Sequence, residues 1–144
     1  MRRKEGKTMR EITVRASPDQ IDEVTAFVNE ILSRAGCPEE IQAEIDVAVD
    51  ELFGNIARYA YGPETGTATV RVETENIPRS LILTFMDCGV PFDPLAEQCP
   101  DTHLLPARDR PIGGLGLFLV RRIMDEIAYR YEDGRNILTV RKRF

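Results

Sequence analysis

The sequence has 144 residues, of which 42% are hydrophobic and 30% charged, a composition that excludes collagen-like, low-complexity and intrinsically disordered chains. Its length predicts one domain with a single hydrophobic core. The formal net charge of -5, from 19 basic and 24 acidic residues, disfavours broad binding to nucleic acid, so we expect no direct nucleic-acid partner.

The amino-terminal segment and the cysteines indicate the compartment. Residues 1–9 predict a flexible basic arm ahead of a domain at 10–144, because no apolar segment follows the first charges as in a secretory signal. No apolar run approaches the roughly 20 residues of a membrane-spanning helix, so we expect a soluble protein with no membrane partner. Cys37, Cys88 and Cys99 show no C-x-x-C spacing, which indicates the reducing cytoplasm rather than a disulfide framework.

Several kinds of catalytic site are excluded by missing motifs. The single histidine, His103, cannot supply a histidine-rich metal site. The serine-hydrolase elbow, the P-loop, and the H-R-D and D-F-G motifs of protein kinases are absent. If the protein binds ATP, it therefore uses a different kind of site.

A strand and a helix are predicted first in the chain. Glu11–Ala16 alternates like a half-buried strand. Ser17-Pro18-Asp19-Gln20 then predicts an N-cap, a proline at the first helical position and a capping box. The apolar spacing that follows predicts a helix up to Gly36.

A second helix, from about Pro38 to Ala60, carries polar residues beside its apolar face. The helical wheel places five apolar residues on one core stripe: Ile41, Ile45, Ala48, Leu52 and Ile56. Glu44, Glu51 and Asn55 fall along one border of that stripe. Asp46 and Asp50 are expected on the opposite side, in solvent.

Two strands are predicted over Thr67–Thr74 and Leu81–Asp87. The period of two puts Asp87 on the same face as Leu83 and Phe85. A carboxylate therefore stands where the pattern predicts a buried hydrophobic side chain.

The last part of the sequence predicts an irregular segment, a helix and a hairpin. Pro91–Pro111 lacks periodicity, and a third helix is expected through Leu117–Met124. Two strands within residues 126–143 are expected to turn at Asp133-Gly134. This order predicts an α+β fold, a two-layer sandwich with a mixed or antiparallel sheet and helices on one face.

Two glycine-containing motifs suggest a ligand site. Free N–H groups at the start of the third helix, at Gly113-Gly114-x-Gly116, can bind phosphates. In Asp87-x-Gly89, a buried carboxylate needs a donor, and the amino group of adenine is one of the right kind.

The motif Glu51-x-x-x-Asn55 adds metal and proton chemistry. Asn55 offers a neutral oxygen suited to Mg²⁺, which takes few protein ligands when it arrives with a nucleotide. Glu51, one turn earlier, can accept a proton from an attacking hydroxyl or water. Each of the three motifs is common alone, and it is their combination that indicates one site.

These three motifs resemble those of a known family. Val49–Asn55 resembles the N box, Asp87–Asp93 the first glycine box and Gly113–Leu117 the second, in the Bergerat ATP-binding fold shared by gyrase, heat-shock chaperone ATPases and histidine kinases. From about Met9 to Phe144 the chain most closely resembles the bacterial anti-sigma factor serine/threonine kinases.

The resemblance implies ATP and Mg²⁺ as cofactors, an anti-sigma antagonist protein as phosphorylation substrate, a sigma factor as second partner, and a homodimer. It also implies a role for each matching residue: Glu51 as general base, Asn55 as Mg²⁺ ligand, Asp87 as adenine reader, and Gly89, Gly113, Gly114 and Gly116 in the nucleotide pocket. Pro91–Ile112 corresponds to the ATP lid.

One position departs from the family pattern. Sporulation-type members carry an arginine where this chain has Ile112, and we expect Arg108 or Arg110 to take its catalytic role beside the γ-phosphate. Two alternatives stay open: a noncatalytic module that changes partners with ATP, and a detached ATPase domain of the histidine-kinase type.

Overall fold

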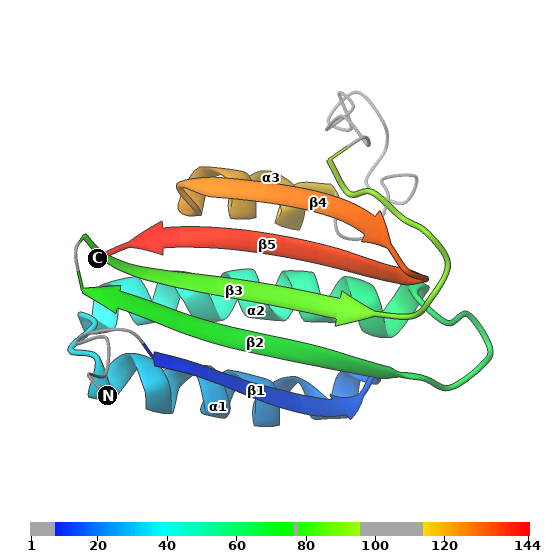
Figure 1. The fold of residues 1–144 in the computed structure, drawn as a ribbon, viewed down its shortest axis with the longest axis horizontal. Coiled ribbons are helices and arrows are strands. Elements are labelled where there is room, and N and C mark those ends of the chain that lie inside the picture. Colours follow the sequence, from blue (N-terminus) through cyan, green and yellow to red (C-terminus); the bar gives the residue numbers. More distant parts are fainter. Residues whose placement is uncertain (1–7, 77, 96–113) are drawn as a thin grey trace.

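One antiparallel sheet and three helices behind it make up the two layers of the fold (Figure 1). The computed structural model describes residues 8–76, 78–95 and 114–144. The elements within these residues are β1 (Thr8–Arg15), the 3₁₀ turn η1 (Pro18–Gln20), α1 (Ile21–Arg34), α2 (Glu39–Tyr59), β2 (Thr67–Asn76), β3 (Arg79–Asp87), α3 (Gly114–Ile123), β4 (Glu126–Glu132) and β5 (Arg135–Arg143). No helix in these ranges is long and apolar enough to cross a membrane.

The strand order is β1-β2-β3-β5-β4, and every neighbouring pair is antiparallel. The predicted α+β sandwich with helices on one face is therefore confirmed, with an antiparallel rather than a mixed sheet. The β4–β5 hairpin turns where predicted. Asp133 and Gly134 have φ values of 53° and 75°, as a two-residue type I′ turn requires.

The amino-terminal end differs from the sequence prediction in two ways. Strand β1 begins at Thr8, so Thr8 and Met9 pair with β2 instead of belonging to the expected arm. The capping box was wrong: the Ser17 hydroxyl donates to the Asp19 carboxylate and makes no cap bond. With Pro18 at its first position, the turn that follows is 3₁₀, and α1 itself begins at Ile21.

The hydrophobic core fills the space between the helices and the sheet. Its fully buried side chains include Val24, Val28, Leu32, Ile45, Val49, Phe53, Val70, Val72, Leu81, Leu83, Phe85, Val120 and Val140. Helix α2 lies between α1 and α3 (Figure 1) and packs against both, so more of its surface is covered than the predicted stripe. Asp46, expected in solvent, is half-buried for this reason, and its Oδ1 is buried.

Phe53 provides the sharpest test of this packing, because its side chain is 0% exposed. Phe53→Ala should lower the free energy of unfolding by about 3–5 kcal/mol, since a large cavity is left behind. The matched control is Phe118→Ala on α3, whose ring is 41% exposed. It should change stability by less than about 1 kcal/mol. Equal losses in urea denaturation would contradict the described core.

Candidate functional site

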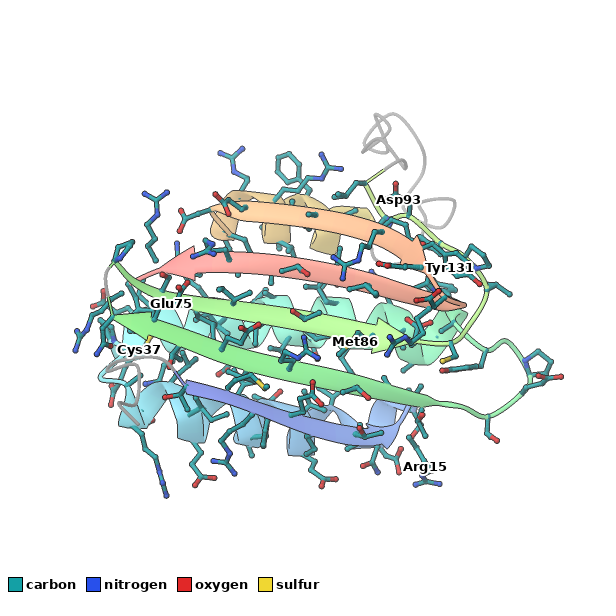
Figure 2. The ribbon with its side chains drawn as sticks, viewed as in Figure 1. Arg15, Cys37, Glu75, Met86, Asp93 and Tyr131 are labelled. Atoms are coloured by element: carbon teal, nitrogen blue, oxygen red, sulfur yellow. The ribbon has the colours of Figure 1, made fainter. Side chains whose placement is uncertain are left out.

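A pocket opens where β3 ends and β5 begins, beside the second half of α2. Its apolar walls come mainly from Leu52, Ile56, Phe85, Val90, Phe92 and Leu138. Five polar side chains also line it: Asn55, Tyr59, Asp87, Tyr129 and Asn136. Apolar walls with a few placed polar groups are typical of sites for planar organic ligands. Figure 2 shows Asp93 and Tyr131 at this same end of the sheet.

Asp87 lies on the inward face of β3, as predicted, and is 6% exposed. Its Oδ1 accepts hydrogen bonds from the Gly89 N–H and from Nδ2 of Asn136, both at 2.9 Å. Within the described residues, Oδ2 makes no hydrogen bond. An unpartnered carboxylate oxygen of a residue that lines a pocket in this way is a ready acceptor for a ligand donor.

Gly89 allows the segment after β3 to lie directly on the end of α2. A Cβ at this position would lie 2.0 Å from the carbonyl oxygen of Ala60, so no side chain fits. The same carbonyl accepts a hydrogen bond from the Val90 N–H at 2.9 Å. The backbone of α2 and the pocket wall at Val90 are therefore in direct contact.

Tyr61 also holds the segment that follows β3. Its hydroxyl donates to the carbonyl of Thr67 at 2.6 Å and accepts from the Cys88 N–H at 2.8 Å. The ring packs over Gly66, where a Cβ would lie 2.3 Å from ring carbons. With the bonds of Gly89 and Val90, the successive N–H groups at 88, 89 and 90 all have fixed partners.

Asn136 joins three parts of the site. Its Nδ2 donates to Asp87 and to the carbonyl of Val90, each at 2.9 Å. Its Oδ1 accepts from the Phe92 N–H at 3.0 Å and from the Tyr129 hydroxyl at 2.5 Å. Burial raises the pKa of Tyr129, so this hydroxyl keeps the proton that it donates.

The two residues predicted on α2 lie one turn apart, and Asn55 lines the pocket. Oδ1 of Asn55 accepts a hydrogen bond from Arg58 at 3.1 Å. Glu51 is half-buried, and its Oε1 is buried without a hydrogen-bond partner among the described residues. Burial and, to a smaller extent, the charge of Asp50 raise the pKa of Glu51, while the charge of Arg58 and the neighbouring Asn55 oppose that rise. A carboxylate of raised pKa is a better proton acceptor.

Asn55 and Glu51 on α2 fit a metal ion that is bound mainly by phosphates and water. Asn55 supplies a neutral oxygen, and the orphaned oxygen of Glu51 lies one turn away. The described ranges contain no cluster of three or more His, Cys, Asp or Glu side chains that could hold a metal alone. Mg²⁺ bound through phosphates and water needs only one or two protein ligands, and Oδ1 of Asn55, which accepts one hydrogen bond from Arg58, keeps a second lone pair for it.

The second glycine box is described only in part. Helix α3 begins at Gly114, earlier than the sequence predicted, with Gly116 in its first turn. Its first N–H groups have no partner within the helix, as an anion site requires. The described residues do not include Gly113 or residues 96–112 of the expected lid, which contain Arg108 and Arg110.

Five polar residues of the site were missed by the sequence analysis: Arg58, Tyr59, Tyr61, Tyr129 and Asn136. The pattern that singled out Asp87, a polar residue on the apolar face of a predicted strand, also applies to Asn136. It shares the inward face of its strand with Leu138 and Val140 and interrupts that apolar face. Arg58 follows Asn55 by three residues, which places the two on one side of a helix.

Residues 14–142 match the family model described as the histidine kinase-like ATPase domain. The chain belongs to this family. The serine-protein kinase RsbW of Listeria innocua is 31% identical over 127 residues, which are 85% of this chain and 80% of that protein. RsbW of Staphylococcus epidermidis is 26% identical over 137 residues, 91% of this chain and 84% of that protein.

Among solved structures, the histidine kinase AdeS of Acinetobacter baumannii matches 93% of this chain and 68% of that chain, with 15% identity and a TM-score of 0.47.

The family match confirms the predicted resemblance to the anti-sigma factor kinases and to the Bergerat ATP-binding fold. The matched region includes α2, the end of β3 and the start of α3, which carry the three predicted motifs. The structure brings Asn55 and Asp87 to one pocket. The roles of the individual residues remain predictions.

Tyr61→Phe tests the contacts around Cys88. Removing the hydroxyl should lower the free energy of unfolding by about 1–3 kcal/mol, because two hydrogen bonds are lost. Burial raises the pKa of Tyr61 above its ordinary value of 10.0. The contribution of the Tyr61 hydroxyl to the free energy of unfolding should therefore be complete below pH 10.0. It should be lost as the pH rises through the raised pKa.

The control for this experiment is Tyr131→Phe, since Tyr131 is 46% exposed at the same end of the sheet. Urea denaturation of both variants at neutral pH and above pH 10.0 gives the comparison. A Tyr61→Phe protein as stable as the wild type would show that these hydrogen bonds do not hold the segment.

Proposed function

We propose that this protein is a cytoplasmic serine/threonine protein kinase that uses ATP and Mg²⁺. The observation that carries the proposal is the position of Asp87, a buried carboxylate with one oxygen free of protein hydrogen bonds in the described structure, in an apolar pocket that Asn55 also lines. The match to the histidine kinase-like ATPase family and the RsbW relatives support the same activity.

Adenine is proposed to lie between the apolar walls of the pocket, with its amino group donating to Oδ2 of Asp87. The amino group is a donor, and the carboxylate is an acceptor only. The phosphates are proposed to meet the free N–H groups at Gly114 and Gly116. Gly113, Arg108 and Arg110 are proposed to complete this end of the site.

Asn55 is proposed to hold the Mg²⁺ ion through Oδ1. When bound, the ion neutralises negative charge on the phosphates during transfer. Arg58 donates to Asn55 through one of its five N–H groups, so others are available to the phosphates. Its guanidinium is suited to a phosphate oxygen, because that pairing is a charge-assisted hydrogen bond.

Glu51 is proposed to accept the proton of the attacking serine or threonine hydroxyl. Its unpartnered buried oxygen and its raised pKa support this role. Phosphoryl transfer depends mostly on positioning and electrostatic stabilisation, so the protein needs few further groups. The phosphorylated protein is proposed to be an anti-sigma antagonist, and a sigma factor is proposed to bind a homodimer of this chain.

The noncatalytic alternative is favoured by one observation. Ile112 stands where the sporulation-type kinases that the chain resembles carry an arginine. Without a cation beside the γ-phosphate, ATP can bind while transfer is slow. A phosphorylation assay decides between the two functions, because only the kinase transfers the phosphoryl group.

Glu51→Gln and Asn55→Ala should separate chemistry from metal binding. Glu51→Gln should bind ATP as the wild type does and phosphorylate the antagonist about 10²- to 10⁴-fold more slowly, since the general base is lost. Asn55→Ala should weaken the Mg²⁺ dependence of ATP binding. Calorimetry with and without Mg²⁺ and transfer of labelled phosphate measure the two effects.

Glu40→Gln is the matched control, because Glu40 is an exposed carboxylate in the first turn of the same helix and receives the same substitution. It should leave both binding and transfer close to wild type. Transfer at the wild-type rate by Glu51→Gln would remove Glu51 from the mechanism. Nucleotide binding without any transfer by the wild type would favour the noncatalytic module.

A further inference from the structure

We propose that Asn136 is a positioning residue for base recognition: it holds the Asp87 carboxylate so that Oδ2 faces the nucleotide, and does not itself contact the base. The inference rests on the proposed function, because it concerns how the same pocket selects adenine. It assigns a task to a residue that none of the three sequence motifs contains.

The hydrogen-bonding capacity of Asn136 is fully used inside the protein. A carboxamide offers two N–H donors and an oxygen with two lone pairs. Nδ2 donates to Asp87 and to Val90, and Oδ1 accepts from Phe92 and Tyr129. The side chain is also 7% exposed. No donor or acceptor is left for a ligand, although Asn136 lines the pocket.

Asp87 has no other neighbour in the sheet that can orient it. In the strand register its partners are Asn136 on β5 and Ala68 on β2, and the side chain of Ala68 has no polar group. The second donor to Oδ1 is the N–H of Gly89, which belongs to the segment after the strand. Both bonds fall on the same oxygen, so Oδ2 is the one left for the ligand.

The same carboxamide also fixes a second part of the pocket wall. Val90 and Phe92 are wall residues, and the backbone of each is bonded to Asn136. The hydroxyl of Tyr129, on β4, keeps Oδ1 of Asn136 in this orientation. One side chain therefore fixes both the base acceptor and the apolar surface beside it.

Asn136→Asp tests this task, because it replaces the donor to Asp87 by a carboxyl oxygen. At about pH 8 the two carboxylates should repel, and ADP should bind about 10-fold or more weakly than to the wild type. As the pH falls toward about 6, the pair should take up one proton, and the shared proton should restore the bond and much of the affinity. The terminal phosphate of ADP also titrates in this range, but it does so equally for both proteins, so the wild type should show no such recovery on acidification.

The other titratable groups around the pair in the described structure are Cys88 and Asp93 on the segment after β3, Tyr59 and Tyr61 at the end of α2, and Tyr129 and Tyr131 on β4. These groups are the same in the wild type and the variant, so the two proteins are compared at each pH. A recovery of affinity present only in the variant therefore reports the new carboxyl pair.

Asn76→Asp is the control for charge, since it makes the same change at an exposed residue at the end of β2. Its ADP affinity should match the wild type at each pH. Tyr129→Phe is the second variant, and it keeps the test decisive if Asn136→Asp does not fold, as judged by circular dichroism. It should weaken ADP and ATP binding alike, by about 2- to 10-fold, because one hydrogen bond to Asn136 is lost.

Calorimetric binding of ADP between about pH 6 and 8.5 gives the result. Weak binding by Asn136→Asp that recovers on acidification supports the inference. Wild-type affinity, or a loss that does not change with pH, overturns it, as does unchanged binding by Tyr129→Phe if the first variant is unfolded. Failure of the wild-type protein to bind any adenine nucleotide overturns the proposed function, and the inference with it.

Discussion

A carboxylate buried at the end of an apolar strand must be stabilised by hydrogen bonds, and Asp87 obtains two of them, from Gly89 and Asn136. This requirement also specifies the sheet. Asp87 and Asn136 meet only in the observed register of β3 and β5, and a slip of β5 by one residue would turn Asn136 to the other face and leave the carboxylate without its partner. The sheet register and the proposed recognition of the base thus depend on the same pair of side chains.

The end of α2 is held to this pair through the segment after β3. Ala60 and Tyr61 bond to Val90 and Cys88, so the helix that carries Asn55 and the strand that carries Asp87 have fixed relative positions. A site on a helix and a strand keeps its geometry better than one built on loops alone. The pocket is therefore preorganised at its base-recognition end.

Periodicity was enough to place single residues on faces but not to pair them. It put Asp87 on the inward face of β3 and put Asn55 beside the core face of α2, and the structure agrees. It could not pair Asp87 with Asn136, because the two lie 49 positions apart and the strand register depends on the whole sheet. Asp46 was misplaced for a similar reason, since helix packing on both sides of α2 is not visible in one helical wheel.

The proposed recognition of adenine depends on Asp87 accepting a hydrogen bond from the amino group of the base. The most direct measurement is the affinity of the wild-type protein for ADP and for the purine nucleotide that lacks only the 6-amino group. Losing the donor leaves Oδ2 of Asp87 covered by the bound nucleotide without a partner, so the analogue should bind at least about tenfold more weakly. Equal affinities for the two nucleotides would show that Asp87 does not recognise the amino group.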